Sequence, residues 1–134
     1  MQNDSLFRIS LKCIIKNAEG DVLVVKERGR NSWDLPGGGI DHNENIHAAI
    51  ARELKEEAGY EGSFTHEVYA IEDPFRLLTR DIWQMRIILN VFPKDMEFAT
   101  GSEADDIQFI SPLQLKDSEY EAERQVYKYL KNDK

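Results

Sequence analysis

The sequence predicts an α/β fold in which a mixed, partly antiparallel sheet lies between helices. Segments rich in β-forming residues come both before and after one central helical segment, 45–58, and a second helical segment follows near the end of the chain. The chain has 134 residues, of which 41% are hydrophobic and 31% are charged. This length and composition suit one compact domain, 1–134, with a sizeable core.

The N-terminal part of the sequence predicts two strands joined by a turn. Residues 6–16 and 21–27 are rich in β-forming residues, and 17–20 has the composition of a turn, so we expect a hairpin. Residues 33–35 predict a short third strand. Pro36 and the three glycines after it then predict a loop whose backbone can turn sharply and approach a ligand closely.

The central segment has the features of a helix with defined ends. Asp41, Asn43 and Glu44 supply side chains that can cap a helix start. Residues 45–58 contain neither proline nor glycine, and Gly59 is a suitable residue just beyond a helix end. We therefore expect a loop, then one helix, then a stop.

The C-terminal half predicts more strands and a last helix. Strand composition or alternation marks 63–71, 81–92 and 104–110, whereas apolar residues available for packing mark a helix at 118–131. The pattern at 75–80 predicts no regular structure. Strands on both sides of the central helix, followed by a C-terminal helix, give the sheet two helical layers to lie between.

The central helix carries an unusual cluster of acids near its end. Glu53 and Glu57 project only about 40° apart around a helix, and Glu56 lies one step round. Ala49 and Ile50 fall on the same side, so the face that packs inward becomes lined with carboxylates. Like charges at this spacing each cost roughly 0.2–0.5 kcal/mol, and acids at this end oppose the helix dipole. A hard divalent cation such as Mg²⁺ removes the conflict, whereas the alternative is a solvated charged face.

The spacing of these residues is that of a known motif. Gly38-x5-Glu44-x7-Arg52-Glu53-Leu54-x-Glu56-Glu57-x-Gly59-Tyr60 resembles the Nudix box of the Nudix hydrolases, the MutT-like family. The departure is Tyr60, where the family usually has an aliphatic residue. The resemblance implies an α/β/α sandwich. It also implies Mg²⁺-dependent hydrolysis of a diphosphate linkage in a nucleoside diphosphate derivative, with Mn²⁺ as a plausible substitute.

The resemblance also implies roles for individual residues. A diphosphate is anionic and repels a nucleophile, so hydrolysis needs cations that neutralise its oxygens and activate a water. The implied metal ligands are Glu53, Glu56, Glu57 and the backbone carbonyl of Gly37, and Arg52 would orient a glutamate through an ion pair. Gly38 and Gly59 would be structural, and Glu44 would ligate or support the site.

The loop before the last predicted strand is expected to supply another carboxylate. Its acids are Glu97, Glu103, Asp105 and Asp106, and we favour Glu103 as general base or extra ligand over a solvated loop acid. The choice of base between Glu53 and Glu103 stays open at this point.

Substrate contacts are less well marked in the sequence. Arg28 and Arg30 follow a predicted strand, and either can hold a phosphate or remain an exposed loop charge. Trp33, Phe75 and Trp83 can stack on a base, although a core role is more common. A nucleoside triphosphate and an ADP-ribose-like molecule are both compatible substrates. A nucleotide sensor without catalysis is the alternative function.

The whole composition excludes some partners. A net charge of −8 without a basic patch argues against a nucleic-acid or membrane-surface binder. Bound cations would reverse the local sign, so phosphate substrates are still compatible. The first residues lack a signal-peptide pattern and no apolar run reaches membrane-spanning length, so we expect a cytoplasmic protein that is a monomer or a homodimer.

Overall fold

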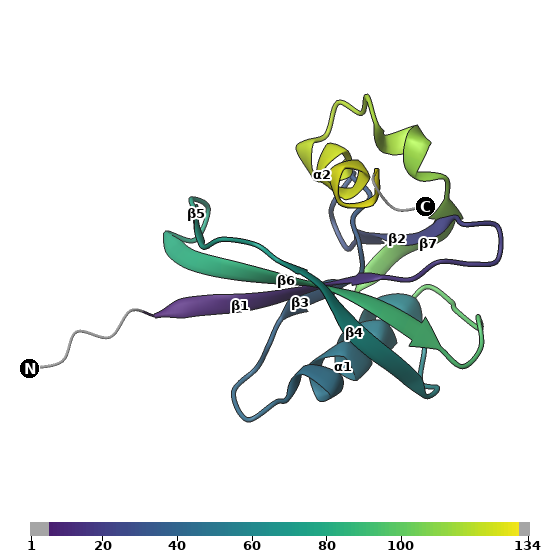
Figure 1. Ribbon diagram of the computed structural model, residues 1–134, viewed down its shortest axis with the longest axis horizontal. Helices are drawn as coiled ribbons and strands as arrows, with labels where there is room; N and C mark the ends of the chain where they lie inside the picture. The colour runs from purple at the N-terminus through teal and green to yellow at the C-terminus, as the bar shows by residue number, and fades with distance from the viewer. Residues whose placement is uncertain (1–5, 132–134) are drawn as a thin grey trace, which may run out of the picture.

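The computed structural model describes residues 6–131, which form two sheets and two α-helices (Figure 1). The elements in chain order are β1 (Phe7–Ile14), β2 (Val22–Glu27), β3 (Gly37–Gly39), α1 (Ile46–Ala58), β4 (Phe64–Ile71), β5 (Phe75–Leu77), β6 (Ile82–Pro93), β7 (Ala104–Ile110), a 3₁₀ helix η1 (Pro112–Leu115) and α2 (Glu121–Leu130).

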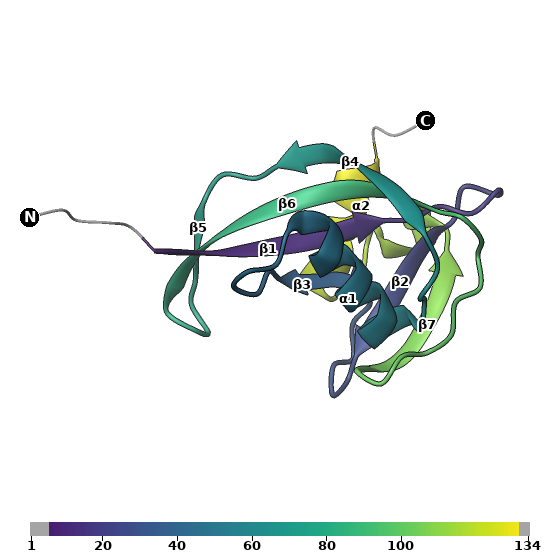
Figure 2. The same cartoon turned by 90° about the horizontal axis from the view of Figure 1, so that it is seen from below.

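The larger sheet is mixed, as the sequence predicts. Its strand order is β3-β1-β6-β4, with β5 also paired to β6. The β1–β6 pair is parallel, whereas the other pairs are antiparallel. A second, two-stranded sheet consists of β2 and β7. Figures 1 and 2 show α1 on one face of the larger sheet and α2 on the other, so the predicted α/β/α arrangement is confirmed.

Alternation along β1 explains why the sheet needs a helix on each face. Successive side chains of a strand point to opposite faces. Leu11 accordingly belongs to a core cluster with Leu54 of α1, and Ile14 belongs to a second cluster with Val126 of α2. Each fully buried aliphatic side chain stabilises the fold by roughly 1.5–3 kcal/mol. The two clusters therefore fix α1 and α2 on opposite sides of the sheet.

The predicted hairpin is wrong beyond its turn. The two strands meet only near the turn, where Lys16 and Val22 form an isolated bridge. Beyond it, β1 pairs with β3 and β6, whereas β2 pairs with β7 in the other sheet. The local pattern identifies a strand, a turn and a strand, but their partners come from distant parts of the chain.

The glycine segment also differs from the prediction. Gly37–Gly39 is strand β3 rather than a free loop, and residues 33–35 contribute only a bridge between Asp34 and Val25. A Cβ at Gly37 would lie 2.0 Å from the carbonyl oxygen of Leu11, so close pairing with β1 requires glycine there.

Two smaller differences from the prediction concern β5 and the start of α2. Residues 75–77, left without structure in the prediction, form β5 against β6. The last helix begins at Glu121 rather than at residue 118, because the Ser118 hydroxyl bonds to Glu123 and to the Tyr120 amide. Within the described residues, no helix is both long and apolar enough to cross a membrane.

Candidate active site

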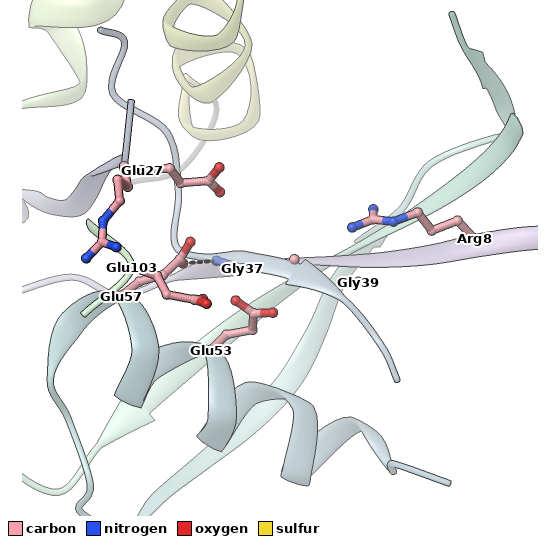
Figure 3. A pocket seen from close by; sticks show the side chains of 9 residues that line it. Arg8, Glu27, Gly37, Gly39, Glu53, Glu57 and Glu103 are labelled. Atoms are coloured by element: carbon pink, nitrogen blue, oxygen red, sulfur yellow. Dashed lines mark hydrogen bonds between the residues drawn. The ribbon is translucent and has the colours of Figure 1, made fainter. Parts of the chain in front are cut away.

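A pocket of about 390 Å³ opens where α1, β3 and the end of β2 meet, and four carboxylates converge on it (Figure 3). They come from α1, from the last residue of β2 and from the loop before β7, while β1 and β3 supply one wall. The lining residues are Arg8, Glu27, Arg28, Gly37, Gly38, Gly39, Glu53, Glu57 and Glu103.

Helix α1 places its acids at this pocket because both of its ends are fixed. The N-cap is Asn45, whose side chain accepts a hydrogen bond of 2.8 Å from the Ala48 amide, rather than one of the three predicted caps. At the other end Gly59 is left-handed, with φ of 60°, and its N–H bonds to the last carbonyls. Between these caps, Glu53 and Glu57 are 7% and 3% exposed.

Glu57 is the most enclosed acid of the pocket. One of its oxygens accepts a hydrogen bond of 2.8 Å from the Gly37 amide, and its side chain shares a hydrogen bond with that of Glu27. Burial, with the nearby charges of Glu27 and Glu53, raises the pKa of Glu57 to about 9, although the Gly37 amide opposes this shift. Its partners are thus an amide and another acid, so without a cation its carboxyl holds a proton at neutral pH.

Glu27 is a site residue that the sequence did not reveal. It ends β2, and only the pairing of β2 with β7 brings it opposite α1. An acid two positions after four buried valine and leucine residues is the one signal that the sequence offers. Such an acid is ordinary at a strand end, so the signal is weak.

Arg52 organises the start of the site, as the resemblance implies. Its guanidinium donates to Glu53 at 2.8 Å, twice to Glu44 at 2.7 and 2.8 Å, and to the Gly39 carbonyl at 2.9 Å. Glu56, the i+4 partner, is farther away at 3.5 Å. The bonds from Arg52 hold the pKa of Glu44 at about 2. Arg52 therefore locks α1, the preceding loop and β3 together around Glu53.

Gly38 makes room for the Glu53 carboxylate. A Cβ at position 38 would lie 2.6 Å from Glu53 Oε1, closer than side-chain contacts allow. Glu53 is buried, and its pKa is raised by burial although Arg52 lowers it. The glycine thus lets the β3 backbone pass directly over a carboxylate.

Glu56 and Glu103 form a pair at the end of α1. Glu56 does not line the pocket, but its side chain hydrogen-bonds to that of Glu103, which does. Burial and this bond raise the pKa of Glu56 to about 7. The Glu103 amide donates to the Glu56 carbonyl at 2.8 Å, and the Arg28 amide donates to the Glu103 carbonyl at 3.1 Å. The other three candidate acids of this loop do not line the pocket.

Of the two arginines predicted as phosphate ligands, only Arg28 lines the pocket. Arg28 lines the pocket, and its guanidinium donates to the Ser102 carbonyl. Arg30 does not line it; its side chain is 71% exposed and pairs with Glu27 at 3.2 Å. Arg8 lines the pocket although the sequence gave no signal for it, because β1 reaches the site only through its pairing with β3.

The three aromatic candidates lie outside the pocket lining. Trp33 packs on the α2 core cluster and lies under the Lys26 ammonium. Phe75 carries the Arg86 guanidinium over its ring, and Trp83 is half exposed on β6.

The donor set of the pocket suits a hard divalent cation. Within residues 6–131, no three acidic, histidine or cysteine side chains already stand in metal-binding geometry. The pocket nevertheless gathers carboxyl oxygens, the donors that Mg²⁺ prefers, and the buried Glu57 carboxyl has no cationic partner among the described residues. A cation held by Glu53 and Glu57 would displace the proton from Glu57 and compensate the resulting charge.

Comparison with known proteins places the chain in a family. The NUDIX domain model matches residues 6–130, so this chain belongs to the Nudix family. It is 49% identical over 53 residues to an RNA pyrophosphohydrolase of Histophilus somni, covering 40% of this chain and 28% of that protein. It is 37% identical over 81 residues to one of Haemophilus influenzae, covering 56% and 41%. The chain therefore spans less than half the length of these curated relatives.

Solved structures show the same fold. A MutT protein from Methanosarcina mazei superposes with a TM-score of 0.74 at 19% identity, covering 95% of this chain and 94% of that one. A MutT Nudix hydrolase from Burkholderia pseudomallei gives 0.72 at 16%, covering 94% and 99%. The dihydroneopterin triphosphate pyrophosphohydrolase of E. coli gives 0.70 at 14%, covering 94% and 97%.

Proposed function

We propose that this protein hydrolyses the diphosphate linkage of a nucleoside diphosphate derivative, with Mg²⁺ bound in the acidic pocket. The observation that carries the proposal is the pair of nearly buried carboxylates, Glu53 and Glu57, which face Glu27 and Glu103 across one open pocket. Burying charges in this way is costly unless a cation compensates them. Family membership and the intact box support the same reaction.

We assign different roles to the individual residues of the pocket. Glu53 and Glu57 would hold the cation, with Glu56 and the Gly37 carbonyl as the further expected ligands, and Mn²⁺ would fit the same oxygens. When bound, the cation would neutralise the phosphate oxygens and lower the pKa of a water. Arg52 keeps Glu53 in place through its bond of 2.8 Å.

Glu103 is the carboxylate that we assign to proton transfer. It lines the pocket from an exposed loop, whereas Glu53 is tied to the Arg52 guanidinium. A side chain without a fixed cationic partner is free to approach a water and take its proton. Glu103 would then be the general base and Glu53 a ligand.

The class of substrate follows from the charge of the site. Arg28 stands at the pocket beside Glu103 and would bind a phosphate, whereas Arg30 would act only at the rim. Relatives named RNA pyrophosphohydrolase and a structural neighbour named dihydroneopterin triphosphate pyrophosphohydrolase both act on phosphate anhydrides. A sensor without catalysis is not favoured, because the pocket collects more carboxylates than nucleotide binding alone needs.

Glu57→Gln is the test of this proposal. The exchange keeps the shape but removes the charge that holds the cation, so hydrolysis of nucleotide diphosphate derivatives with Mg²⁺ should fall roughly a hundredfold or more. Activity is measured as phosphate release from nucleoside triphosphates, ADP-ribose and sugar nucleotides after phosphatase coupling. Glu67→Gln, at an exposed position of β4, is the control. Equal activity of the Glu57→Gln and wild-type proteins would show that the site is assigned wrongly.

A further inference from the structure

Arg8 is held at the end of the pocket by a partner on the neighbouring strand. Arg8 of β1 and Gln84 of β6 are register partners, and Arg8 Nη1 donates to Gln84 Oε1 at 2.6 Å. Gln84 is only 3% exposed, so its amide has little freedom to move. The Arg8 side chain is thus fixed in direction, unlike an arginine on an exposed loop.

Strand β3 is shaped to let this guanidinium lie over it. A Cβ at Gly39 would be 2.8 Å from Arg8 Nη2, so a larger residue there would displace the guanidinium from this position. Figure 3 shows Arg8 beyond Gly39, with its guanidinium directed toward the carboxylates of Glu53 and Glu57. Arg8 has five N–H donors and Gln84 accepts one of them, so a free edge faces the pocket.

The pocket therefore has a guanidinium at each end and acids between them. Arg28 lies beside Ser102 and Glu103 at the end of α1, and Arg8 lies beside Gly39 on the other side of Glu53. A row of phosphates with cations at its centre matches this order of charges. A diphosphate flanked by two neutral sugars would leave the Arg8 end without an anion to bind, at a cost in desolvation.

We infer that Arg8, positioned by Gln84, binds a phosphate beyond the cleaved linkage, so the favoured substrates carry three or more phosphates in a row. The inference rests on the proposed hydrolysis and narrows its substrate class to nucleoside polyphosphates over ADP-ribose-like molecules. Guanidinium binds phosphate through two parallel charge-assisted hydrogen bonds, which gives Arg8 geometric as well as electrostatic selectivity.

The test compares two substrates in the same set of variants. In Arg8→Gln, kcat/KM for a nucleoside triphosphate should fall by roughly ten- to a hundredfold, whereas kcat/KM for ADP-ribose should change by less than about threefold. Arg8→Lys should recover part of the loss, since lysine keeps the positive charge but lacks the two parallel N–H donors of the guanidinium. Gln84→Leu should lower kcat/KM for the triphosphate relative to that for ADP-ribose by a smaller factor, mainly by raising KM. Arg76→Gln, which breaks an exposed ion pair with Asp81 in the β5–β6 hairpin, is the matched arginine control.

A binding measurement tests the contact without turnover. Isothermal titration calorimetry with a methylene-bridged nucleoside triphosphate and Mg²⁺ should show Kd about tenfold higher for Arg8→Gln than for wild type. An unchanged Kd, or an equal loss of kcat/KM for both substrates, would overturn the role of Arg8. Failure of the proposed function is a separate result, because it appears as full activity in Glu57→Gln.

Discussion

Gly38 shows how one absent Cβ decides the position of a carboxylate in the pocket. Glu53 Oε1 lies only 2.6 Å from the position that this atom would take. The backbone at Gly38 is not in the left-handed region, so alanine is conformationally acceptable there. The glycine is required for the approach of a side chain rather than for a turn.

We therefore expect Gly38→Ala to reduce activity far more than stability. The flexible end of Glu53 can move away from the new methyl group, but a displacement of about 1 Å can cost about a hundredfold in rate. The measurements are kcat/KM and the thermal midpoint of the same preparation. Gly37→Ala is the contrasting variant, because its Cβ would meet the Leu11 backbone at 2.0 Å and should destabilise the whole fold. A Gly38→Ala protein with wild-type kcat/KM would contradict this account.

The sequence could predict those site residues that are set by local spacing. Glu53 and Glu57 share one helix face, so their positions follow from helix geometry alone. Glu27 and Arg8 enter the pocket through the pairings β2–β7 and β1–β3, which join distant segments. No local pattern contains that information. Arg30 shows the converse, since its sequence position resembles that of Arg28 but its side chain lies at the exposed rim.

At the scale of elements, the Glu44–Arg52 pair fastens the loop before α1 to the helix. The Glu44 carboxylate accepts two hydrogen bonds from Arg52. It accepts a third, of 2.9 Å, from the Asp41 amide in the same loop. Arg52 also reaches the Gly39 carbonyl of β3. One ion pair therefore connects β3, the loop and α1, and its strength should depend on pH.

Glu44→Gln tests that dependence. The bonds from Arg52 lower the pKa of folded Glu44 from 4.5 to about 2. A lowered folded-state pKa means that the charged form stabilises the fold above about pH 4.5, and that this contribution disappears as the pH falls toward 2. Unfolding by urea should thus show Glu44→Gln less stable than wild type at pH 7, with the gap closing under acid conditions. A gap of the same size at pH 7 and at about pH 3 would contradict the ion pair as its cause.

Element types were more predictable than element partners. The two α-helices and most of the strands lie where composition and periodicity place them, because those signals are local. The β1–β2 hairpin is wrong because a turn at residues 17–20 brings the chain back without determining which strand each side joins. The glycine strand β3 was missed because glycines favour turns in general, and only contact with β1 makes them a strand here.

At the scale of the whole molecule, the pocket lies where both sheets and α1 meet. The core clusters hold α1 against the larger sheet, and the β2–β7 sheet brings Glu27 and Glu103 to the far side of the same opening. The fold thus concentrates acids from three elements in a protein whose net charge is already −8. Mutual repulsion among these acids opposes folding, and a bound cation would relieve it.

We accordingly expect Mg²⁺ to stabilise the folded protein. At a concentration about a hundred times its Kd, a ligand that binds only the folded state adds about 2.7 kcal/mol, which raises Tm by roughly 8 °C in a domain of this size. Thermal unfolding with and without Mg²⁺ measures the shift, and removal of the ion by a chelator should reverse it. General screening of the net charge must be separated from binding, so NaCl at equal ionic strength is the control. The shift should be much smaller in Glu57→Gln but unchanged in Glu67→Gln, whereas an equal rise with NaCl would show that the acids hold no cation.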